Sequence, residues 1–168
     1  MCCTFAVTFI TRFVWTPLNA TVSEDLGLTA VQAGAFMSAF FVGYVITQIP
    51  GGYLADRIGV KWVLSAGILL SGVASLGMAY ITSYGPGFVL RVITGLGGGV
   101  FMACATKVIA DNFPNLKERG IAFGILQVGA TVGSLVSNNM GAALLEAYGW
   151  QTAFRVTGYI AIAFAVVI

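Results

Sequence analysis

The stretch GGYLADRIGVKW, Gly51 to Trp62, is a short charged segment between two long apolar runs. The run before it covers about 30–50 and the run after it about 62–81. A helix needs about 20 apolar residues to cross the hydrocarbon core of a bilayer. The pattern therefore predicts two membrane-spanning helices joined by a charged loop.

Within this segment, Gly51 and Gly52 lack side chains, so the backbone can turn there and a neighbouring helix can approach closely. We expect the preceding helix to end at these glycines. Asp56 offers a carboxylate to a facing helix end or basic group, and Arg57 and Lys61 anchor one membrane face.

The composition extends this pattern to the whole chain. Of the 168 residues, 58% are hydrophobic and 8% charged, and the mean hydropathy is +0.94. A soluble domain carries about 25% charged residues. We therefore predict an all-α, polytopic membrane protein of six transmembrane helices, without a soluble domain. Their expected positions are about 3–18, 30–50, 62–81, 88–109, 121–144 and 152–168.

The charged residues predict the orientation. Basic residues flank the loops after the second and fourth helices: Arg57, Lys61, Lys107, Lys117 and Arg119. Acidic residues lie in the alternate loops: Glu24, Asp25 and Glu146. Because Lys and Arg favour the cytoplasmic side, we expect a multi-pass protein of the cell membrane with both termini in the cytoplasm.

Several classes of function are excluded. The net charge of +2 is too small to indicate a nucleic-acid partner, and the chain has no histidine. It therefore lacks the commonest general base and metal ligand, and the serine–histidine pair of a rhomboid-like protease. Cys2, Cys3 and Cys104 have the spacing of neither a metal site nor a disulfide framework. We expect no enzyme activity, catalytic residue, metal or cofactor.

The chain also repeats itself after ninety residues. Gly43 then falls on Gly133, Asp56 on Glu146, and the glycine at 59 on the one at 149. Each copy holds three helices, an odd number, so the second is inverted relative to the first. Two inverted three-helix repeats are typical of secondary transporters, which rock repeats around a midplane site.

The segment from Gly51 to Trp62 resembles the helix 2–3 loop signature of the major facilitator superfamily, glycine-x-leucine-alanine-aspartate-arginine-x-glycine-basic-basic. Val60 departs from it, because a basic residue is usual there. In that family the loop is a conformational latch between two halves. The resemblance assigns this role to Gly52, Asp56, Arg57, Gly59 and Lys61.

Two further segments resemble the same family. In RVITGLGGG, Arg91 and Gly95 match the helix 4 motif, although Thr94 replaces a usual glutamine, and Gly95 and Gly99 form a small-residue face for helix packing. The segment DNFPNLKERG resembles the next cytoplasmic loop, whose Glu118 and Arg119 we expect to pair with the latch.

Members of the family have twelve helices, so the resemblance implies an N-terminal half, either a fragment or a half-size chain that pairs with a second one. Proton-driven drug exporters of the family carry a glycine–proline pair in helix 5. The stretch from 129 to 141 has no proline, which disfavours export.

Two arginines lie at membrane depth. Arg12 is near the middle of the first helix, and Arg91 is about one turn into the fourth. In this fold both helices line the central cavity, and a buried arginine is rarely idle. Guanidinium is always charged and matches carboxylate or phosphate. The pair predicts a cavity for a small anionic substrate, although Arg91 alone also fits a structural part of its motif. The distance from Arg12 to Asp25 also resembles that in the organic-anion and sugar-phosphate branch.

Other polar or aromatic residues at membrane depth are Trp15, Tyr44, Gln48, Gln127, Asn138 and Asn139. We select Gln127 as a third substrate-binding residue. No carboxylate lies deep in these helices, so coupling to H⁺ or Na⁺ would depend on the other half. The main hypothesis is a secondary active transporter of an organic anion, working by alternating access; the alternative is a proton-coupled multidrug or metabolite exporter. A channel or a purely structural protein is a different class, but it leaves the repeat and the latch unexplained.

Overall fold

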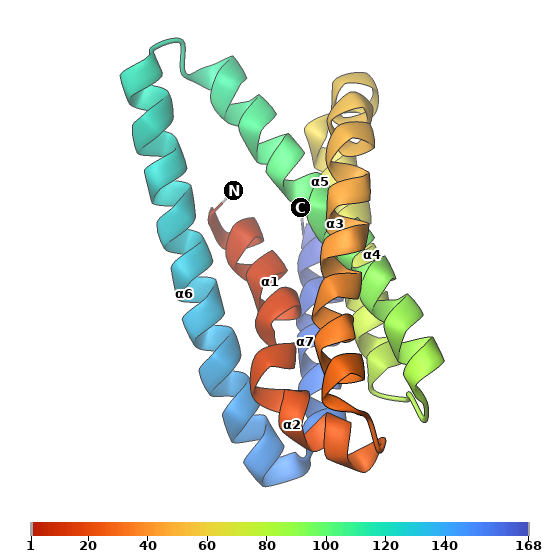
Figure 1. Cartoon of the computed structure of the whole chain (residues 1–168). Helices are drawn as coiled ribbons and strands as arrows, with labels where there is room; N and C mark the ends of the chain where they lie inside the picture. Colours follow the sequence, from red (N-terminus) through yellow and green to blue (C-terminus); the bar gives the residue numbers. More distant parts are fainter. Residues whose placement is uncertain (1, 168) are drawn as a thin grey trace.

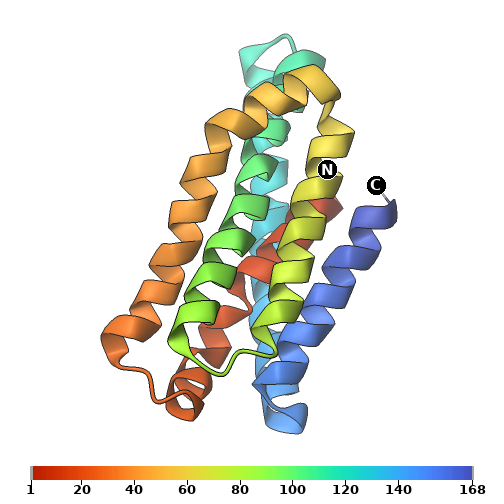
Figure 2. The ribbon, with the colours of Figure 1, turned by 90° about the vertical axis from the view of Figure 1, so that its right-hand side faces the viewer.

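A computed structural model of the chain describes residues 2–167, which form seven helices and, within that range, no strand. The helices are α1 (Cys2–Phe13), α2 (Trp15–Asp25), α3 (Ala30–Ile58), α4 (Val60–Met78), α5 (Tyr84–Asn112), α6 (Leu116–Tyr148) and α7 (Trp150–Val167). They form one bundle in which helices successive in the chain run in opposite directions, with α1 and α2 counted as one, whereas the packed pairs α3–α5 and α1–α6 run parallel. The two termini lie in the same half of the bundle (Figures 1 and 2).

The helices α1 and α2 together make the first crossing, so seven helices give six crossings, as predicted. Val14 interrupts them, three residues before Pro17. Proline has no N–H to donate to the carbonyl four residues back and its ring crowds that carbonyl, which explains the break. Four helices among the described residues, α3 to α6, are long and apolar enough to cross a membrane on their own.

Most of the predicted helices are shorter than the helices in the structure. The first crossing continues to Asp25 rather than ending at about residue 18. The helix α3 does not end at Gly51 and Gly52: Pro50 and both glycines lie inside it, and it continues to Ile58. Hydropathy detects only the apolar part of a helix, whereas the polar ends of these helices extend beyond the ~30 Å hydrocarbon core. The last predicted residue, Ile168, lies outside the described range.

Local sequence explains several helix ends. Thr29 caps α3 with a reciprocal pair of hydrogen bonds: its hydroxyl accepts from the Gln32 backbone N–H (3.3 Å), and the Gln32 side chain accepts from the Thr29 N–H (2.9 Å). Gly59 and Gly149 separate α3 from α4 and α6 from α7, with φ of +92° and +83°. Such angles strain any residue with a Cβ, so glycine allows both junctions to be this short.

Packing follows the inverted repeat. The helix α3 packs mainly on α5 and α1 mainly on α6, whereas α4 packs on both α5 and α7. The α3–α5 and α1–α6 pairs are equivalent when α5, α6 and α7 repeat the first three crossings. A Cβ at Gly43 would overlap the backbone of Leu96, and a Cβ at Gly133 would overlap that of Ala6. A shift of ninety residues converts the first contact into the second, so the two repeats use the same close helix crossing.

Small residues bring α3 and α5 together. A Cβ at Gly95 would overlap the carbonyl oxygen of Phe40, and one at Gly99 that of Tyr44. This confirms the small-residue packing face predicted for Gly95 and Gly99. In α3, Gly51 contacts Val100 closely, whereas a Cβ at Gly52 would meet only Ala103 at an ordinary 3.8 Å.

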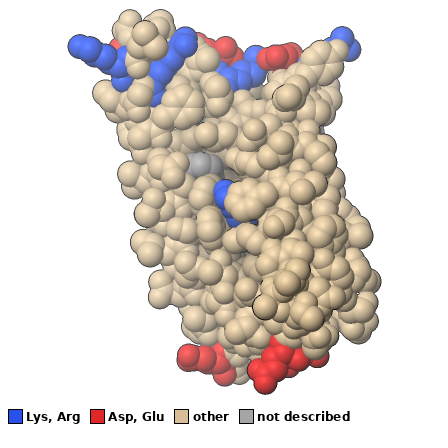
Figure 3. Space-filling model, in the orientation of Figure 1, with Lys and Arg blue, Asp and Glu red and all other residues tan. Residues whose placement is uncertain are grey.

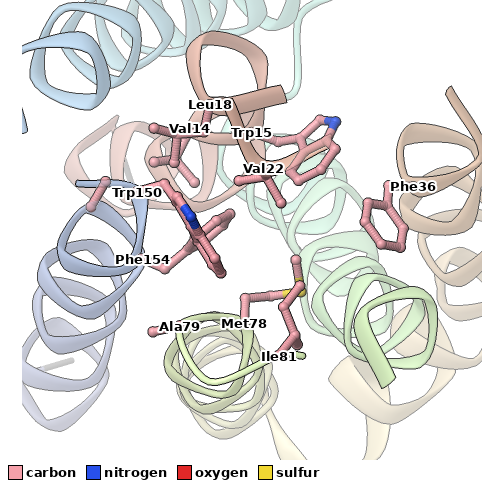
Figure 4. Packing of buried hydrophobic residues seen from close by; sticks show 11 residues of the cluster. Val14, Trp15, Leu18, Val22, Phe36, Met78, Ala79, Ile81, Trp150 and Phe154 are labelled. Carbon is pink, nitrogen blue, oxygen red and sulfur yellow. The ribbon is translucent and has the colours of Figure 1, made fainter. Parts of the chain in front are cut away.

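The largest apolar cluster joins α2, α3, α4 and α7 near one end of the bundle (Figure 4). It includes the rings of Trp15, Phe36 and Phe154, all nearly inaccessible to solvent. Trp150 belongs to the same cluster, and its Nε1–H donates to the Asp25 carboxylate (2.6 Å), which links α7 to the end of α2. This end of the first crossing is therefore held firmly against α7.

Candidate functional site

Charge divides the molecule into two ends and an uncharged middle (Figure 3). One end carries both basic and acidic groups, the other carries acidic groups, and a basic spot is visible between them on the face shown. This is the distribution expected of a membrane protein with a basic and an acidic side. The basic spot at mid-height directs attention to arginine at membrane depth.

Arg12 lies in the last turn of α1, and its side chain is partly buried. Its guanidinium carbon is surrounded by aromatic rings at centroid distances between 4.9 Å (Phe41) and 5.6 Å (Tyr44). The Nε atom is buried and has no hydrogen-bond partner. Among residues 2–167 no carboxylate forms an ion pair with Arg12.

Five rings surround this guanidinium, and we call them the aromatic box: Phe9, Phe13, Phe40, Phe41 and Tyr44. Aromatic faces attract a cation by about 0.5–2 kcal/mol each, most strongly where water is excluded. The box therefore explains how a charged arginine is tolerated at this depth. It provides no anion, so the charge of Arg12 remains available to one.

Arg91 has a different environment. It is 1% exposed, and Nε and one terminal nitrogen are buried without a hydrogen-bond partner. Its guanidinium carbon lies 4.6 Å from the ring of Trp15 and 5.6 Å from that of Phe154. Because α5 begins at Tyr84 rather than at about residue 88, Arg91 lies about 10 Å into the helix, at 1.5 Å per residue. The prediction of one turn was too shallow.

The two arginines therefore do not share one open site in the structure. Arg12 contacts aromatic rings of α1 and α3, whereas Arg91 is enclosed by Trp15 of α2 and Phe154 of α7. Gln127, the third predicted residue, is exposed on α6. It begins a polar stripe at helical spacing that continues through Thr131, Ser134 and Asn138. Exposed polar side chains at membrane depth disfavour contact with lipid, so this stripe indicates a face covered by water or protein.

The predicted latch residues gather at the basic end. Asp56 forms an ion pair with Lys107 of α5 (2.5 Å), and Lys107 also lies 3.5 Å from Asp111. Arg57 stacks on the ring of Tyr53 (4.6 Å), and Lys61 is exposed in the first turn of α4. An open pocket of about 410 Å³ lies beside the Asp56–Lys107 pair, between α3 and α5.

The expected pairing of Glu118 and Arg119 with this latch is not what the structure shows. Glu118 accepts a hydrogen bond from Asn115 (3.0 Å), and Arg119 donates to the carbonyls of Phe113 (2.7 Å) and Ala110 (3.1 Å). These bonds close the connection between α5 and α6. The partner of Asp56 is Lys107, which the sequence pattern linked only to the orientation of the chain in the membrane.

Comparison with known proteins identifies the class. The family model of the Major Facilitator Superfamily matches residues 1–168, so the chain belongs to that superfamily of membrane transporters. It is accordingly an integral membrane protein that belongs to a superfamily of transporters rather than to a family of enzymes.

Individual relatives share between 30% and 33% sequence identity with the chain. The chain is 31% identical over 160 residues to a probable L-galactonate transporter of Escherichia coli, covering 95% of this chain and 35% of that protein. It is 33% identical over 162 residues to a probable sulfoacetate transporter of Cupriavidus necator, covering 96% and 37%. A voltage-gated purine nucleotide uniporter of Rattus norvegicus is 30% identical, with 89% and 34% covered. The chain thus spans about a third of the length of the curated relatives it matches.

The fold is shared with a solved transporter. The crystal structure of a bacterial homolog to the human lysosomal transporter Spinster, inward-facing and unoccupied, superposes with a TM-score of 0.85 at 21% sequence identity. The superposition covers 99% of this chain and 40% of that one. This match shows the fold of a six-helix half.

Proposed function

We propose that this chain forms one half of a secondary active transporter that carries a small organic anion across the cell membrane by alternating access. One observation carries the proposal. Arg12 holds a partly exposed guanidinium at membrane depth, with a buried unpartnered nitrogen and no acidic ion-pair partner among the described residues. An anionic substrate would supply the missing charge in a geometry that guanidinium matches well.

The names of the relatives support the same substrate class. Galactonate, sulfoacetate and purine nucleotides are all anions, as is the substrate of the 4-hydroxybenzoate transporter of Pseudomonas putida, which is 31% identical over 147 residues. The shared feature is negative charge rather than size or shape. Arg12 is a residue of this chain suited to recognise that feature.

The other two predicted residues receive different roles. Arg91 is enclosed by Trp15 and Phe154, so a substrate would touch it only if these rings separated; we propose that it acts mainly through its charge. Gln127 lies on the polar stripe of α6. We propose that this stripe faces the transport path and offers hydrogen bonds to the substrate.

The latch proposal includes the Asp56–Lys107 pair. We propose that Gly52, Asp56, Arg57, Gly59 and Lys61 stabilise one conformation of the transporter from the basic end, together with Lys107. Glu118 and Arg119 would contribute by fixing the adjacent α5–α6 connection. Asp56 is exposed beside an open pocket, which leaves room for a further group there.

The remaining parts of the transporter are also proposals. We propose that both termini are cytoplasmic, because the basic end of the bundle is the end that favours the cytoplasm. A second half, encoded in the same gene or supplied by a second chain, would complete the cavity. Coupling to H⁺ or Na⁺ would require a group from that half.

The experiment measures thermal stabilisation of the complete gene product in detergent by carboxylates, sugar phosphates, inorganic anions and lipophilic cations. Arg12→Gln is compared with Arg155→Gln, a control at an exposed arginine that contacts Tyr80. We expect stabilisation by one anion class, lost in Arg12→Gln and kept in the control. Stabilisation by lipophilic cations alone would overturn the anion proposal and favour a multidrug exporter.

A further inference from the structure

We propose that the Arg12 site selects anions with a planar, aromatic body over aliphatic or polyhydroxylated anions. This inference rests on the proposed function, because it requires Arg12 to bind the anionic group. It goes further by naming the part of the substrate that lies beyond the charge. The aromatic box and the surfaces next to it support this selectivity.

The box surrounds the guanidinium from two helices. Phe9 and Phe13 come from α1, with centroids 5.4 Å and 5.0 Å from the Arg12 guanidinium carbon. Phe40 and Phe41 come from α3, at 5.4 Å and 4.9 Å. An anion that reaches Arg12 must therefore pass between aromatic rings, and its body will lie against them.

The box has a closed side and an open side. Phe40 is 2% exposed, whereas Phe41 is 42% exposed. Phe41 also lines an apolar pocket of about 400 Å³, together with Val42, Val45 and Ile46. The surface next to the charge is therefore a ring that continues into an apolar wall, which suits an apolar body attached to a carboxylate.

Hydroxyl groups on a substrate would find few partners near Arg12. Thr8 and Thr11 are the nearest hydroxyl-bearing residues before it on α1. Both are buried, and both donate to α1 carbonyls, those of Thr4 (3.0 Å) and Thr8 (2.9 Å). A hydroxyl buried without a hydrogen bond is costly. The phenol of Tyr44 remains as a polar group of the box, which suits a substrate with one hydroxyl better than one with many.

The same rings also favour a substrate with a planar body. Aromatic pairs gain about 0.5–1.5 kcal/mol beyond the burial of their surface when they stack or meet edge to face. Exclusion of water by the rings also strengthens the attraction between guanidinium and carboxylate. An aromatic carboxylate gains from both the ring contact and the stronger attraction to guanidinium. Acetate gains only from the attraction to guanidinium, and gluconate also loses the hydration of its hydroxyl groups.

The test measures dissociation constants of the complete gene product for four carboxylates: benzoate, cyclohexanecarboxylate, gluconate and acetate. We expect benzoate to bind at least about tenfold more tightly than acetate or gluconate, and several-fold more tightly than cyclohexanecarboxylate. Phe41→Leu should weaken benzoate about fivefold, as expected for one lost stacking contact, and leave acetate unchanged. The control Tyr159→Leu removes an exposed ring from α7 and should change neither.

The possible failures can be distinguished. If gluconate binds as tightly as benzoate, or if Phe41→Leu weakens acetate and benzoate equally, the aromatic selectivity is wrong while the anion proposal survives. Preference for gluconate would indicate the polar stripe of α6 as the recognition surface. If no carboxylate binds, or if Arg12→Gln binds benzoate normally, the proposed function itself fails.

Discussion

Arg12 and Arg91 each lie in the first membrane crossing of a three-helix repeat, and their environments differ. Arg12 is partly exposed within five aromatic rings from α1 and α3. Arg91 is 1% exposed and lies against Trp15 and Phe154. Neither has an ion pair with a carboxylate in the described part of the chain. The two residues share their charge and differ in whether water or a solute reaches it.

This difference separates two uses of a membrane arginine. A guanidinium that is open on one side can exchange water for an anion, whereas an enclosed one contributes packing and a fixed positive potential. The same residue type therefore supports different predictions at the two positions. They follow from the largest expected effect to the smallest.

The largest effect is expected at Arg12. Arg12→Gln removes the charge that we propose binds the substrate, and loss of one member of a buried charge pair costs about 2–5 kcal/mol. We expect the dissociation constant for an anion to rise by about a hundredfold or more, measured by calorimetry. Arg12→Lys keeps the charge without the planar fork and should give an intermediate value. Wild-type affinity in Arg12→Gln would contradict the assignment.

The second effect is expected at Gly95, which lies one turn after Arg91 and packs on the carbonyl of Phe40 in the aromatic box. Gly95→Ala pushes α3 away from α5, and overpacking of this kind costs about 1–3 kcal/mol. We expect a lower melting temperature together with weaker anion binding. Gly124→Ala is the control, because a Cβ there meets nothing within 4 Å. Equal melting temperatures and anion affinities in the two variants would refute the close crossing of α3 and α5.

A smaller effect is expected at Arg91. Arg91→Met replaces an enclosed arginine, with two unpartnered nitrogens, by an apolar side chain of similar length. Substitution of buried charge by packed apolar groups is often neutral or stabilising. We expect an unchanged or higher melting temperature and an anion affinity that falls by no more than about threefold, because the variant removes the positive potential of Arg91 but no direct contact with the substrate. An affinity loss as large as that of Arg12→Gln would mean that the substrate touches Arg91 directly.

The smallest effect on binding is expected at the latch. Asp56→Asn breaks the exposed pair with Lys107, and exposed ion pairs contribute little to stability. We expect anion affinity to stay constant while the transport rate in proteoliposomes changes by about two- to fivefold, because the proposed latch would bias the conformational equilibrium. Lys117→Met, at the same end without an ion pair among the described residues, is the control. A rate change of the same size in the control would remove the latch role from Asp56.

Much of the fold was predictable from the sequence. The apolar runs predicted six crossings, and the glycines repeated after ninety residues predicted the inverted arrangement. The ends of the helices were not predictable, because segments such as 51–58 and 116–120 are polar or glycine-rich yet helical. Gly51 and Gly52 were interpreted as the end of the helix, whereas Gly51 packs closely on Val100 of α5 and α3 continues through both glycines to Ile58.

The candidate site was predictable only in part. A charged residue inside an apolar run is visible in the sequence, so Arg12 and Arg91 were both found. The burial of Arg91 depends on Trp15 and Phe154, which are 76 and 63 residues away in the chain. The ring pairs at 9 and 13 and at 40 and 41 were visible, but only tertiary packing brings them together. Lys107 was missed as the partner of Asp56 for the same reason.

The central claim is that Arg12 faces the transport path whereas Arg91 is sealed in the bundle. Its most direct test is the rate at which a water-soluble thiol reagent modifies Arg12→Cys and Arg91→Cys in the complete gene product, after its native cysteines are replaced by serine. Such reactions require water access to the thiolate. We predict that the cysteine at position 12 reacts at least about tenfold faster than the one at position 91. Equal rates, or faster reaction at position 91, would contradict the account.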